Sequence, residues 1–417
     1  MSWEKVKLGD VSESCLGKML DQRKNKGTYK PYLANVNVRW GSFDLDNLQE
    51  MKFEDDEDER YGIKYGDLII CEGGEPGRCA IWKEELPNMK IQKALHRVRV
   101  NEEMDYRYVY YWFLLAGKQG ALKQYYTGAT IMHMPGQKLK EVVIDKPPLD
   151  VQRRIGYYLE SFDNLIDNNQ KQIKLIEEAA QRLYKEWFVD LRFPGYEDVK
   201  IVDGVPEGWN CQFLTEVVGY EIGGGWGEDS VTEKCDKPAY VIRGTDLHGI
   251  TNGNISGIPY RYHANKNLEA RALEDGDIIF EVSGGSKAEG VARTVLIRDT
   301  VLEFLRAPVM CASFCKLVRV NEKQYSQLLF DTFQYMRYSG KTGEYDKKSA
   351  SSIVNYRWKD FLVQETILIP TNELLLKYNS LSANLYHMIL TKSVEIEKAK
   401  EARDRLLPKL MSGEIEV

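Results

Sequence analysis

The chain has 417 residues, with 57 Lys or Arg against 63 Asp or Glu, so its formal net charge is −6 at pH 7. This length predicts two or three domains with large cores. The negative charge excludes a uniformly basic protein that coats nucleic acid, but it does not exclude a local basic cleft. The longest apolar stretch, residues 109–117, is too short to cross a bilayer, and the first residues lack an apolar secretion signal. We therefore expect a cytoplasmic protein without membrane contact.

Metal and disulfide chemistry are not predicted. The seven cysteines include no Cys-x-x-Cys pair, and the five histidines are scattered along the chain. Because a zinc site needs about four clustered ligands, we expect no bound metal. The cysteines are typical of buried small side chains in a reducing compartment.

The chain contains one internal repeat. The matching segments, at offsets of 206, 210 and 220 residues, are Trp3–Val11 with Trp209–Val217, residues 66–70 with 276–280, and residues 98–102 with 318–322. Their order is kept while the offset rises, as expected for two copies of one domain with longer loops in the second copy.

Within each copy, short runs of Val, Ile, Tyr and Phe bounded by Gly and Asp are typical of strands joined by turns. Helical patterns occupy residues 105–117 and 322–336. The predicted fold class is therefore α+β, with similar globular domains at residues 1–147 and 206–369. The acidic run Glu54–Glu59 is predicted to be a solvated loop.

Each copy is followed by apolar residues at alternating steps of four and three, the heptad pattern of a coiled coil. The predicted helices are residues 148–193 and 370–413, with residues 192–208 as the linker before the second domain. The first predicted seam is Ile155, Leu159, Phe162, Ile166, Asn169, Ile173, Ile176, Ala180, Leu183 and Trp187. The second is Tyr378, Ser382, Leu385, Ile389, Lys392, Ile396, Ala399, Arg403, Leu406 and Leu410.

Two such stripes are not stable when exposed to water, so we expect the helices to pack against each other as an antiparallel coiled coil. Asn169 and Lys392 occupy equivalent seam positions. A polar residue in a seam costs stability but specifies register, so this pair is predicted to fix one alignment.

The sequence lacks the motifs of several catalytic classes. It has no phosphate-binding P-loop, no glycine-rich turn for a methyl donor, no Gly-x-Ser-x-Gly and no His-Glu-x-x-His. It also lacks the Pro-Pro-aromatic loop with which amino-methyltransferases hold a flipped base. We therefore predict a chain that is not an enzyme and needs no cofactor.

Glycine-rich loops with cationic or hydroxyl side chains are the remaining candidates for function. Such loops let the backbone approach DNA while side chains reach phosphates or base edges. The candidate DNA-binding residues are Gly77, Arg78, Thr127 and Thr130 in the first copy, and Ser286, Lys287, Arg293, Lys341, Lys347 and Lys348 in the second. An ordinary turn with solvated charges is the alternative interpretation of each loop.

One pair of segments resembles a known family. Thr127-Gly128-Ala129-Thr130, followed by Pro147-Pro148-Leu149-Asp150-Val151-Gln152-Arg153-Arg154-Ile155, is similar to the Ser-Gly-Ser/Thr loop and the Pro-Pro-Leu-x-x-Gln-x-x-Ile segment of type I restriction-modification specificity subunits. The second copy departs from this pattern, with Ile369-Pro370-Thr371-Asn372 and no Gln at the matching place.

The resemblance covers essentially the whole chain. It implies two target-recognition domains and two spacer helices that read a bipartite, asymmetric site in double-stranded DNA. It also implies separate modification subunits that methylate adenine, and separate restriction subunits that hydrolyse ATP, translocate and cut. The alternative is a coiled-coil-spaced scaffold that binds proteins without DNA specificity, and salt-sensitive binding to duplex DNA would separate the two.

Overall fold

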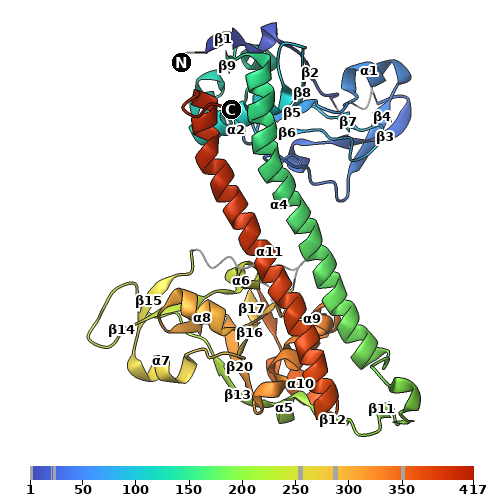
Figure 1. Ribbon diagram of the computed structural model, residues 1–417, viewed down its shortest axis with the longest axis vertical. Coiled ribbons are helices and arrows are strands. Elements are labelled where there is room, and N and C mark those ends of the chain that lie inside the picture. The colour runs from blue at the N-terminus through green and yellow to red at the C-terminus, as the bar shows by residue number, and fades with distance from the viewer. Residues whose placement is uncertain (1–2, 20, 22–24, 252–256, 285–289, 349–352) are drawn as a thin grey trace. The chain divides into compact units, whose positions relative to one another are not determined.

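The computed structural model describes residues 3–417 except for positions 20, 22–24, 252–256, 285–289 and 349–352. The fold is α+β, as predicted, with two globular domains that are each followed by a long helix (Figure 1). The chain divides into two compact units, residues 1–166 with 399–417, and residues 167–398. Each long helix therefore begins in the unit of its own domain and ends in the other unit.

The first domain is built on small sheets. One contains, in order, β2 (Ser12–Leu16), β8 (Leu95–Val100), β5 (Leu68–Cys71) and β6 (Cys79–Ile81). Another places β3 (Thr28–Leu33) between antiparallel β4 (Gln49–Phe53) and parallel β7 (Lys90–Ile91), and β1 (Glu4–Lys7) pairs with β9 (Val143–Lys146). The accompanying helices are η1 (Leu8–Asp10), η2 (Asn35–Asn37), η3 (Asp55–Glu57), α1 (Asp58–Tyr61), α2 (Tyr106–Lys118), η4 (Ala121–Tyr125) and α3 (Gly136–Lys140).

The second domain repeats this topology. Its strand orders are β13 (Val218–Gly223), β20 (Cys315–Val320), β16 (Ile278–Glu281) and β18 (Thr294–Leu296), then β15 (Tyr260–His263), β14 (Lys237–Ile242) and β19 (Val309–Cys311). Here too the central strand, β14, is antiparallel to one neighbour and parallel to the other, and β12 (Asn210–Phe213) pairs with β23 (Thr366–Ile369). The predicted internal repeat is therefore confirmed.

The remaining elements of the second domain include longer loops and an additional small sheet. That sheet holds β17 (Ser283–Gly284), β22 (Val354–Tyr356) and β21 (Asp346–Lys348). The helices are α5 (Leu214–Val217), η7 (Gly244–Asp246), α6 (Leu247–Thr251), α7 (Asn265–Arg271), α8 (Asp299–Leu305), η8 (Lys323–Tyr325), α9 (Ser326–Tyr338), η9 (Lys341–Tyr345) and α10 (Trp358–Gln364). The linker before β12 carries η6 (Tyr196–Asp198), β10 (Ile201–Val202) and β11 (Val205–Pro206).

The same ion pair joins equivalent strands in both domains. The carboxylate of Asp67 accepts two hydrogen bonds from Arg99, at 2.7 and 2.7 Å, and that of Asp277 accepts two from Arg319, at 2.7 and 2.8 Å. Both carboxylates are buried. A buried carboxylate is stable only when paired, and the bidentate geometry fixes the angle of the arginine. The repeat thus preserves a structural charge pair as well as an apolar pattern.

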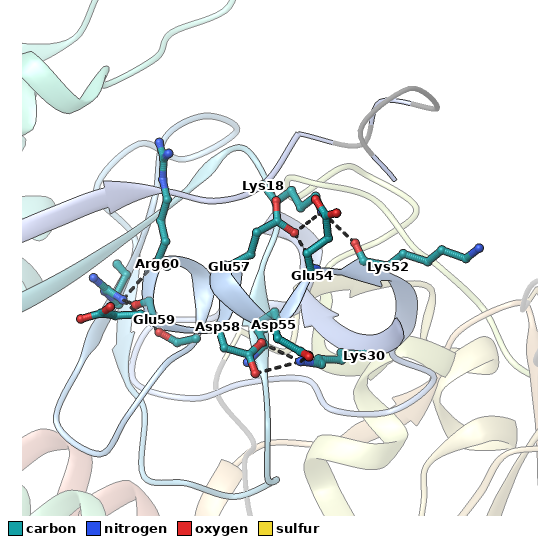
Figure 2. Close-up of polar contacts among 12 residues, drawn as sticks. Lys18, Lys30, Lys52, Glu54, Asp55, Glu57, Asp58, Glu59 and Arg60 are labelled. Atoms are coloured by element: carbon teal, nitrogen blue, oxygen red, sulfur yellow. Dashed lines mark hydrogen bonds and ion pairs between the residues drawn. The ribbon is translucent and has the colours of Figure 1, made fainter. Parts of the chain in front are cut away.

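The acidic run is solvated over most of its length, as predicted, but it is helical and not a loop. It forms η3 and α1, with Glu54, Asp55, Asp56 and Glu59 exposed, and Figure 2 shows Glu57 turned towards Lys18 and Asp58 towards Lys30. Glu57 pairs with Lys18, while Asp58 pairs with Lys30 at 2.7 Å and with Lys90 at 3.0 Å. Lys18 and Lys90 are almost fully buried, so their ammonium groups need these carboxylates. Glu57 and Asp58 therefore neutralise lysines of the first domain, while the rest of the run faces solvent.

The glutamine of the Pro-Pro-Leu-x-x-Gln segment has a structural role. Gln152 is buried near the start of α4 (Leu149–Tyr184), where its Oε1 accepts from the backbone N–H of Asp105 at 3.0 Å. Its Nε2 donates to the carbonyl oxygen of Pro147 at 2.9 Å. Asp105 is the N-cap of α2, and its carboxylate accepts from the backbone of Arg107 at 3.0 Å. Gln152 thus fastens the first long helix to the cap of α2.

The two long helices are antiparallel within each unit. In the first unit, Asp163 of α4 bonds to Arg403 of α11 (Asn372–Ser412) at 2.6 Å. In the second unit, Asn169 donates to Glu395 at 3.0 Å, and the Phe188 ring lies 4.8 Å from that of Tyr378. Every position of the two seams is buried or partly buried. The helix α4 ends at Tyr184 and is continued by the π-helical turn η5 (Lys185–Val189), which points aromatic residues into the core of the second unit.

A buried polar cluster joins α9 to α11 in the second unit. The carboxylate of Asp331 accepts from Ser382 Oγ at 2.6 Å, from the hydroxyl of Tyr378 at 2.8 Å and from Gln327 Nε2 at 3.0 Å. Burial disfavours the charged carboxylate more than these donors stabilise it, and raises the pKa of Asp331 from 3.8 to about 6.

This raised pKa predicts a pH dependence of stability. The contribution of Asp331 is fully present below its unfolded pKa of 3.8 and is lost as the pH rises through about 6. Between about pH 4 and about pH 8 the loss should be about 2 to 3 kcal/mol. The Asp331→Asn variant keeps the shape but does not titrate, so urea unfolding of the second domain should show a weaker pH dependence by that amount. Identical pH profiles would contradict the prediction.

Candidate nucleic-acid interface

Three segments of the first domain meet at one surface. They are η2, the glycine-rich loop at residues 73–78 and the loop at residues 127–133. Asn35 Nδ2 donates to the carbonyl oxygen of Gly73 at 2.8 Å, which joins the first segment to the second. An isolated bridge pairs Gly73 with His133, which joins the second to the third. The backbones of Thr127 and His133 exchange hydrogen bonds of 2.8 and 2.9 Å, so the third loop closes on itself.

Side-chain hydrogen bonds and close packing hold the glycine-rich loop in place. The hydroxyl of Tyr126 donates to the carbonyl oxygen of Pro76 at 2.6 Å, and Trp40 Nε1 donates to the carboxylate of Glu75 at 2.7 Å. Gly77 is buried with φ of +90°, and a Cβ there would lie 2.5 Å from Leu122 Cδ1. Only glycine fits this left-handed, crowded position. The loop is therefore a fixed platform.

Arg78 belongs to this platform. Its guanidinium donates to the backbone and side-chain oxygens of Asn35, each at 3.2 Å, and pairs with Glu75 at 3.2 Å. Its side chain is only 19% exposed. Arg78 is thus in place to hold η2 against the glycine-rich loop, and Glu75 neutralises much of its charge.

The loop at residues 127–133 presents several accessible side chains, and Val36 of η2 is also exposed. Thr127 and Thr130 are exposed, and beside them Ile131 is 64% and Met132 45% exposed. Hydroxyl groups reach base edges, and apolar side chains contact the thymine methyl group or wedge against base steps. The sequence analysis missed Ile131 and Met132 because it searched for cations and glycines. Exposed apolar residues inside a predicted polar loop were the available signal.

A buried histidine supports the base of this loop. His96 Nε2 lies 3.1 Å from the carbonyl oxygen of Met134, so that nitrogen carries the proton and donates. Burial lowers the pKa of His96, which keeps the ring neutral. The backbone N–H of Met134 also donates to the carbonyl oxygen of Glu72 at 2.7 Å, which ties the end of the loop to the residue just before the glycine-rich loop.

The second domain builds a corresponding surface from η7, β17 and the β21–β22 hairpin. Ser283 Oγ donates to Asn355 Oδ1 at 2.8 Å where β17 pairs with β22. A Cβ on Gly244 of η7 would lie 2.6 Å from the carboxylate of Glu281, at the end of β16. The three segments therefore adjoin as their counterparts in the first domain do.

The predicted cations of the second domain have different surroundings. Arg293 forms two hydrogen bonds to the buried Glu281, at 2.8 and 2.5 Å. Lys341 pairs with Glu344 at 2.8 Å and with Glu365 at 3.3 Å, whereas Lys347 is exposed on β21. Ser286 and Lys287 lie outside the described residues, as does the side chain of Lys348. Of the predicted cations of the second domain whose side chains are described, Lys347 is the most suitable for a phosphate contact, because it is exposed.

Other kinds of site are not found in the described parts of the chain. Among those residues, no group of three or more His, Cys, Asp or Glu side chains is placed to hold a metal ion. No helix of the described residues is long and apolar enough to span a membrane.

Known proteins with similar sequences are of one class. Residues 1–178 match the family model of the type I restriction modification DNA specificity domain. The chain is 28% identical over 357 residues to the type I restriction enzyme MjaIX specificity subunit of Methanocaldococcus jannaschii, covering 84% of this chain and 78% of that protein. It is 25% identical to the MjaVIII specificity subunit of the same organism, covering 100% of this chain and 93% of that protein.

A solved structure shows the same fold. The S subunit of a type I restriction-modification system from M. genitalium superimposes with a TM-score of 0.60 and 14% identity, covering 98% of this chain and 96% of that one. The duplicated α+β fold with two long helices is therefore shared with that S subunit. Residues 1–178 match the family's DNA specificity domain and the chain is similar over most of its length to type I restriction enzyme specificity subunits, which confirms the resemblance found in its sequence.

Gly77, the buried glycine with positive φ in the glycine-rich loop, gives a testable prediction. Gly77→Ala should destabilise the first domain by about 1 to 3 kcal/mol, because the new methyl group meets buried Leu122. Gly204→Ala is the matched control, since its φ is +81° and no described atom lies within 4 Å of the added Cβ. Urea unfolding measures both. Equal costs for the two variants would mean that backbone strain alone, rather than the close approach to Leu122, explains the glycine.

Proposed function

We propose that the chain reads a bipartite, asymmetric site in double-stranded DNA, each globular domain recognising one half. The observation that carries this proposal is the repetition of one framework with two different sets of loops. Strand order and the buried Arg–Asp pair repeat between the domains. The loop surfaces differ, because a short closed loop at residues 127–133 in the first domain corresponds to the β21–β22 hairpin in the second. A common framework with different loops suits two domains that read different bases.

Within this proposal, the two kinds of exposed side chain have different tasks. Thr127, Thr130, Ile131 and Met132 supply hydroxyl and apolar contacts to base edges. Lys347 supplies a phosphate contact, which positions the domain without reading sequence. Arg78 and Arg293 act indirectly, by holding the loops through Glu75 and Glu281.

The chemistry belongs to other chains in this proposal. The chain itself is non-catalytic and needs no cofactor, modification subunits methylate the DNA, and restriction subunits hydrolyse ATP and cut it. The outer faces of α4 and α11 are the surfaces on which modification subunits dock. The paired helices set the number of uncontacted base pairs between the half-sites.

Exchange of one domain tests the division of labour. Replacing residues 1–147 by the equivalent domain of a relative should change one half of the methylated motif and leave the other half intact, because the second loop surface is untouched. The measurement is the methylated motif in a genome that carries the hybrid and its modification partners. A change in both halves would refute independent recognition by the two domains.

The phosphate contact of Lys347 can be measured separately. Lys347→Ala should weaken binding to duplex DNA for every sequence and flatten the slope of log affinity against log salt by about one, since one phosphate contact is lost. Lys266→Ala is the control, because Lys266 is also exposed in the second domain but lies on α7, away from the three loop segments. An unchanged slope for Lys347→Ala would mean that Lys347 contacts no phosphate and that the alternative interpretation, an ordinary turn with solvated charges, holds for this segment.

A further inference from the structure

The second domain contains a cavity of about 120 Å³ beside the segment that follows β13. Gly225 lies on one side of it, and His263, at the end of β15, lies on another together with Asn267 and Arg271 of α7. A space of this size holds a small oxyanion or a few water molecules. Among the described residues that line the cavity, Arg271 is a cation and none is a carboxylate.

The first domain fills the equivalent place with a lysine side chain. The backbone N–H of Lys18 donates to the carbonyl oxygen of Ile91 at 3.0 Å, and that of Gly225 donates to the carbonyl oxygen of Cys311 at 3.0 Å. The two acceptors hold the same place in β7 and β19, so Gly225 is the counterpart of Lys18. Lys18 is almost fully buried, and its ammonium group pairs with Glu57 (Figure 2). The second domain therefore has a cavity where the first has a lysine.

The side chains opposite the lysine have also changed. The strand register places His263 where the first domain has Phe53, at an offset of 210 residues. The same offset places Asn267 where the first domain has Glu57, and Arg271 lies one turn further along α7. The first domain thus offers a carboxylate to a cation that it supplies itself. The second offers a guanidinium and supplies no side chain to fill the space.

Two polar groups at the cavity lack the partners that they need. His263 is 3% exposed, and its Nε2 has no hydrogen-bond partner among the described residues. Burial, together with Arg261 and Arg271, lowers the pKa of His263, so the ring is neutral and has one N–H to donate. Arg271 donates from Nε to the carbonyl oxygen of Gly223 at 2.9 Å, and from Nη1 to the side-chain and backbone oxygens of Asn267 at 3.3 and 3.5 Å. These acceptors are all neutral, so within the described chain no carboxylate balances Arg271, and its Nη2 is left for a ligand.

The backbone does not require glycine at position 225. A Cβ on the preceding Gly224 would lie 2.2 Å from the carbonyl oxygen of Cys311, so glycine is structural there. A Cβ on Gly225 would lie 3.2 Å from the flexible end of Met310, and its φ is outside the left-handed region. Lys18 shows that a long side chain is compatible with this position in the first domain. The effect of glycine at 225 is therefore to keep the cavity open.

We propose that this cavity binds a small tetrahedral oxyanion such as phosphate, and that Arg271 Nη2 and His263 Nε2 donate to its oxygens. Charge-assisted hydrogen bonds of this kind are the strong ones in proteins. Water satisfies a hydrogen bond but supplies no counterion to the guanidinium, whereas phosphate supplies both. Free phosphate and a backbone phosphate of a nucleic acid present the same oxygens, so the test must distinguish them. The inference rests on the fold of the second domain and does not require the proposed DNA recognition.

Calorimetric titration of the full-length chain with inorganic phosphate, at constant ionic strength, tests the site. We expect saturable binding of one phosphate per chain at millimolar concentration. His263→Phe copies the residue of the first domain, so the fold should be kept while phosphate affinity falls about tenfold, because one charge-assisted hydrogen bond is lost. Arg271→Gln should weaken binding at least as much. Lys266→Gln is the matched control, since Lys266 is an exposed cation on the same helix that does not line the cavity.

A second variant and a competitor complete the test. Gly225→Lys combined with Asn267→Glu rebuilds the lysine–carboxylate pair of the first domain, so it should abolish phosphate binding without lowering the melting temperature. Displacement of bound phosphate by duplex DNA would support the site with a backbone phosphate as the ligand, and undisturbed binding would support it with a free anion. The proposal is overturned if no saturable binding occurs, or if His263→Phe and Arg271→Gln bind phosphate as the wild type does. Because phosphate binding is first measured without DNA, a failure of DNA recognition leaves that result unaffected.

Discussion

The structure depends on the burial of one apolar stripe along each long helix. Neither stripe is stable in water, so α4 and α11 pack against each other, and each end of the pair also enters the core of a globular domain. In the first unit, Leu407 and Leu410 from the end of α11 share a hydrophobic cluster with Leu8 and Val11 from the start of the chain. In the second unit, Trp187 and Phe188 from η5, the turn that continues α4, share a cluster with Leu214 and Val217. Each domain is therefore completed by a helix that belongs, along the chain, to the other domain.

Much of this arrangement was predictable because it follows from periodic patterns. Segments at fixed offsets predicted two copies of one domain, and steps of four and three residues predicted the paired helices, since apolar burial acts on residues in regular register. The partners of individual charges were not predictable in the same way. Arg78 is held by Asn35 and Glu75, and the acidic residue Asp58 by Lys30 and Lys90. Most of these partners are distant in sequence and meet only after the sheets form. The exposure of Ile131 and Met132 also depends on how the loop folds, so it could not be predicted from composition.

A protein with a net charge of −6 can still bind a polyanion when its contacts are few and well placed. In both domains the arginine of the loop surface is matched by a carboxylate, Arg78 by Glu75 and Arg293 by Glu281. This pairing gives rigidity to the loops and reduces the attraction to phosphate that is independent of sequence. Under the proposed function, recognition then relies more on hydroxyl and apolar side chains such as Thr130 and Ile131, whose contacts differ between bases. Weak general attraction combined with rigid loops favours specificity over affinity.

The pairing of the two long helices is connected to the kind of DNA site that the proposed function requires. If two α4 helices paired, two first domains would be brought together, and the assembly would read the same half-site twice, as a symmetric dimer does. An asymmetric site requires one first domain and one second domain, and therefore one α4 paired with one α11. In this chain Asp163 of α4 and Arg403 of α11 form one contact of that pairing. Under the proposed function, pairing one α4 with one α11 is therefore what brings two different loop surfaces to one DNA site.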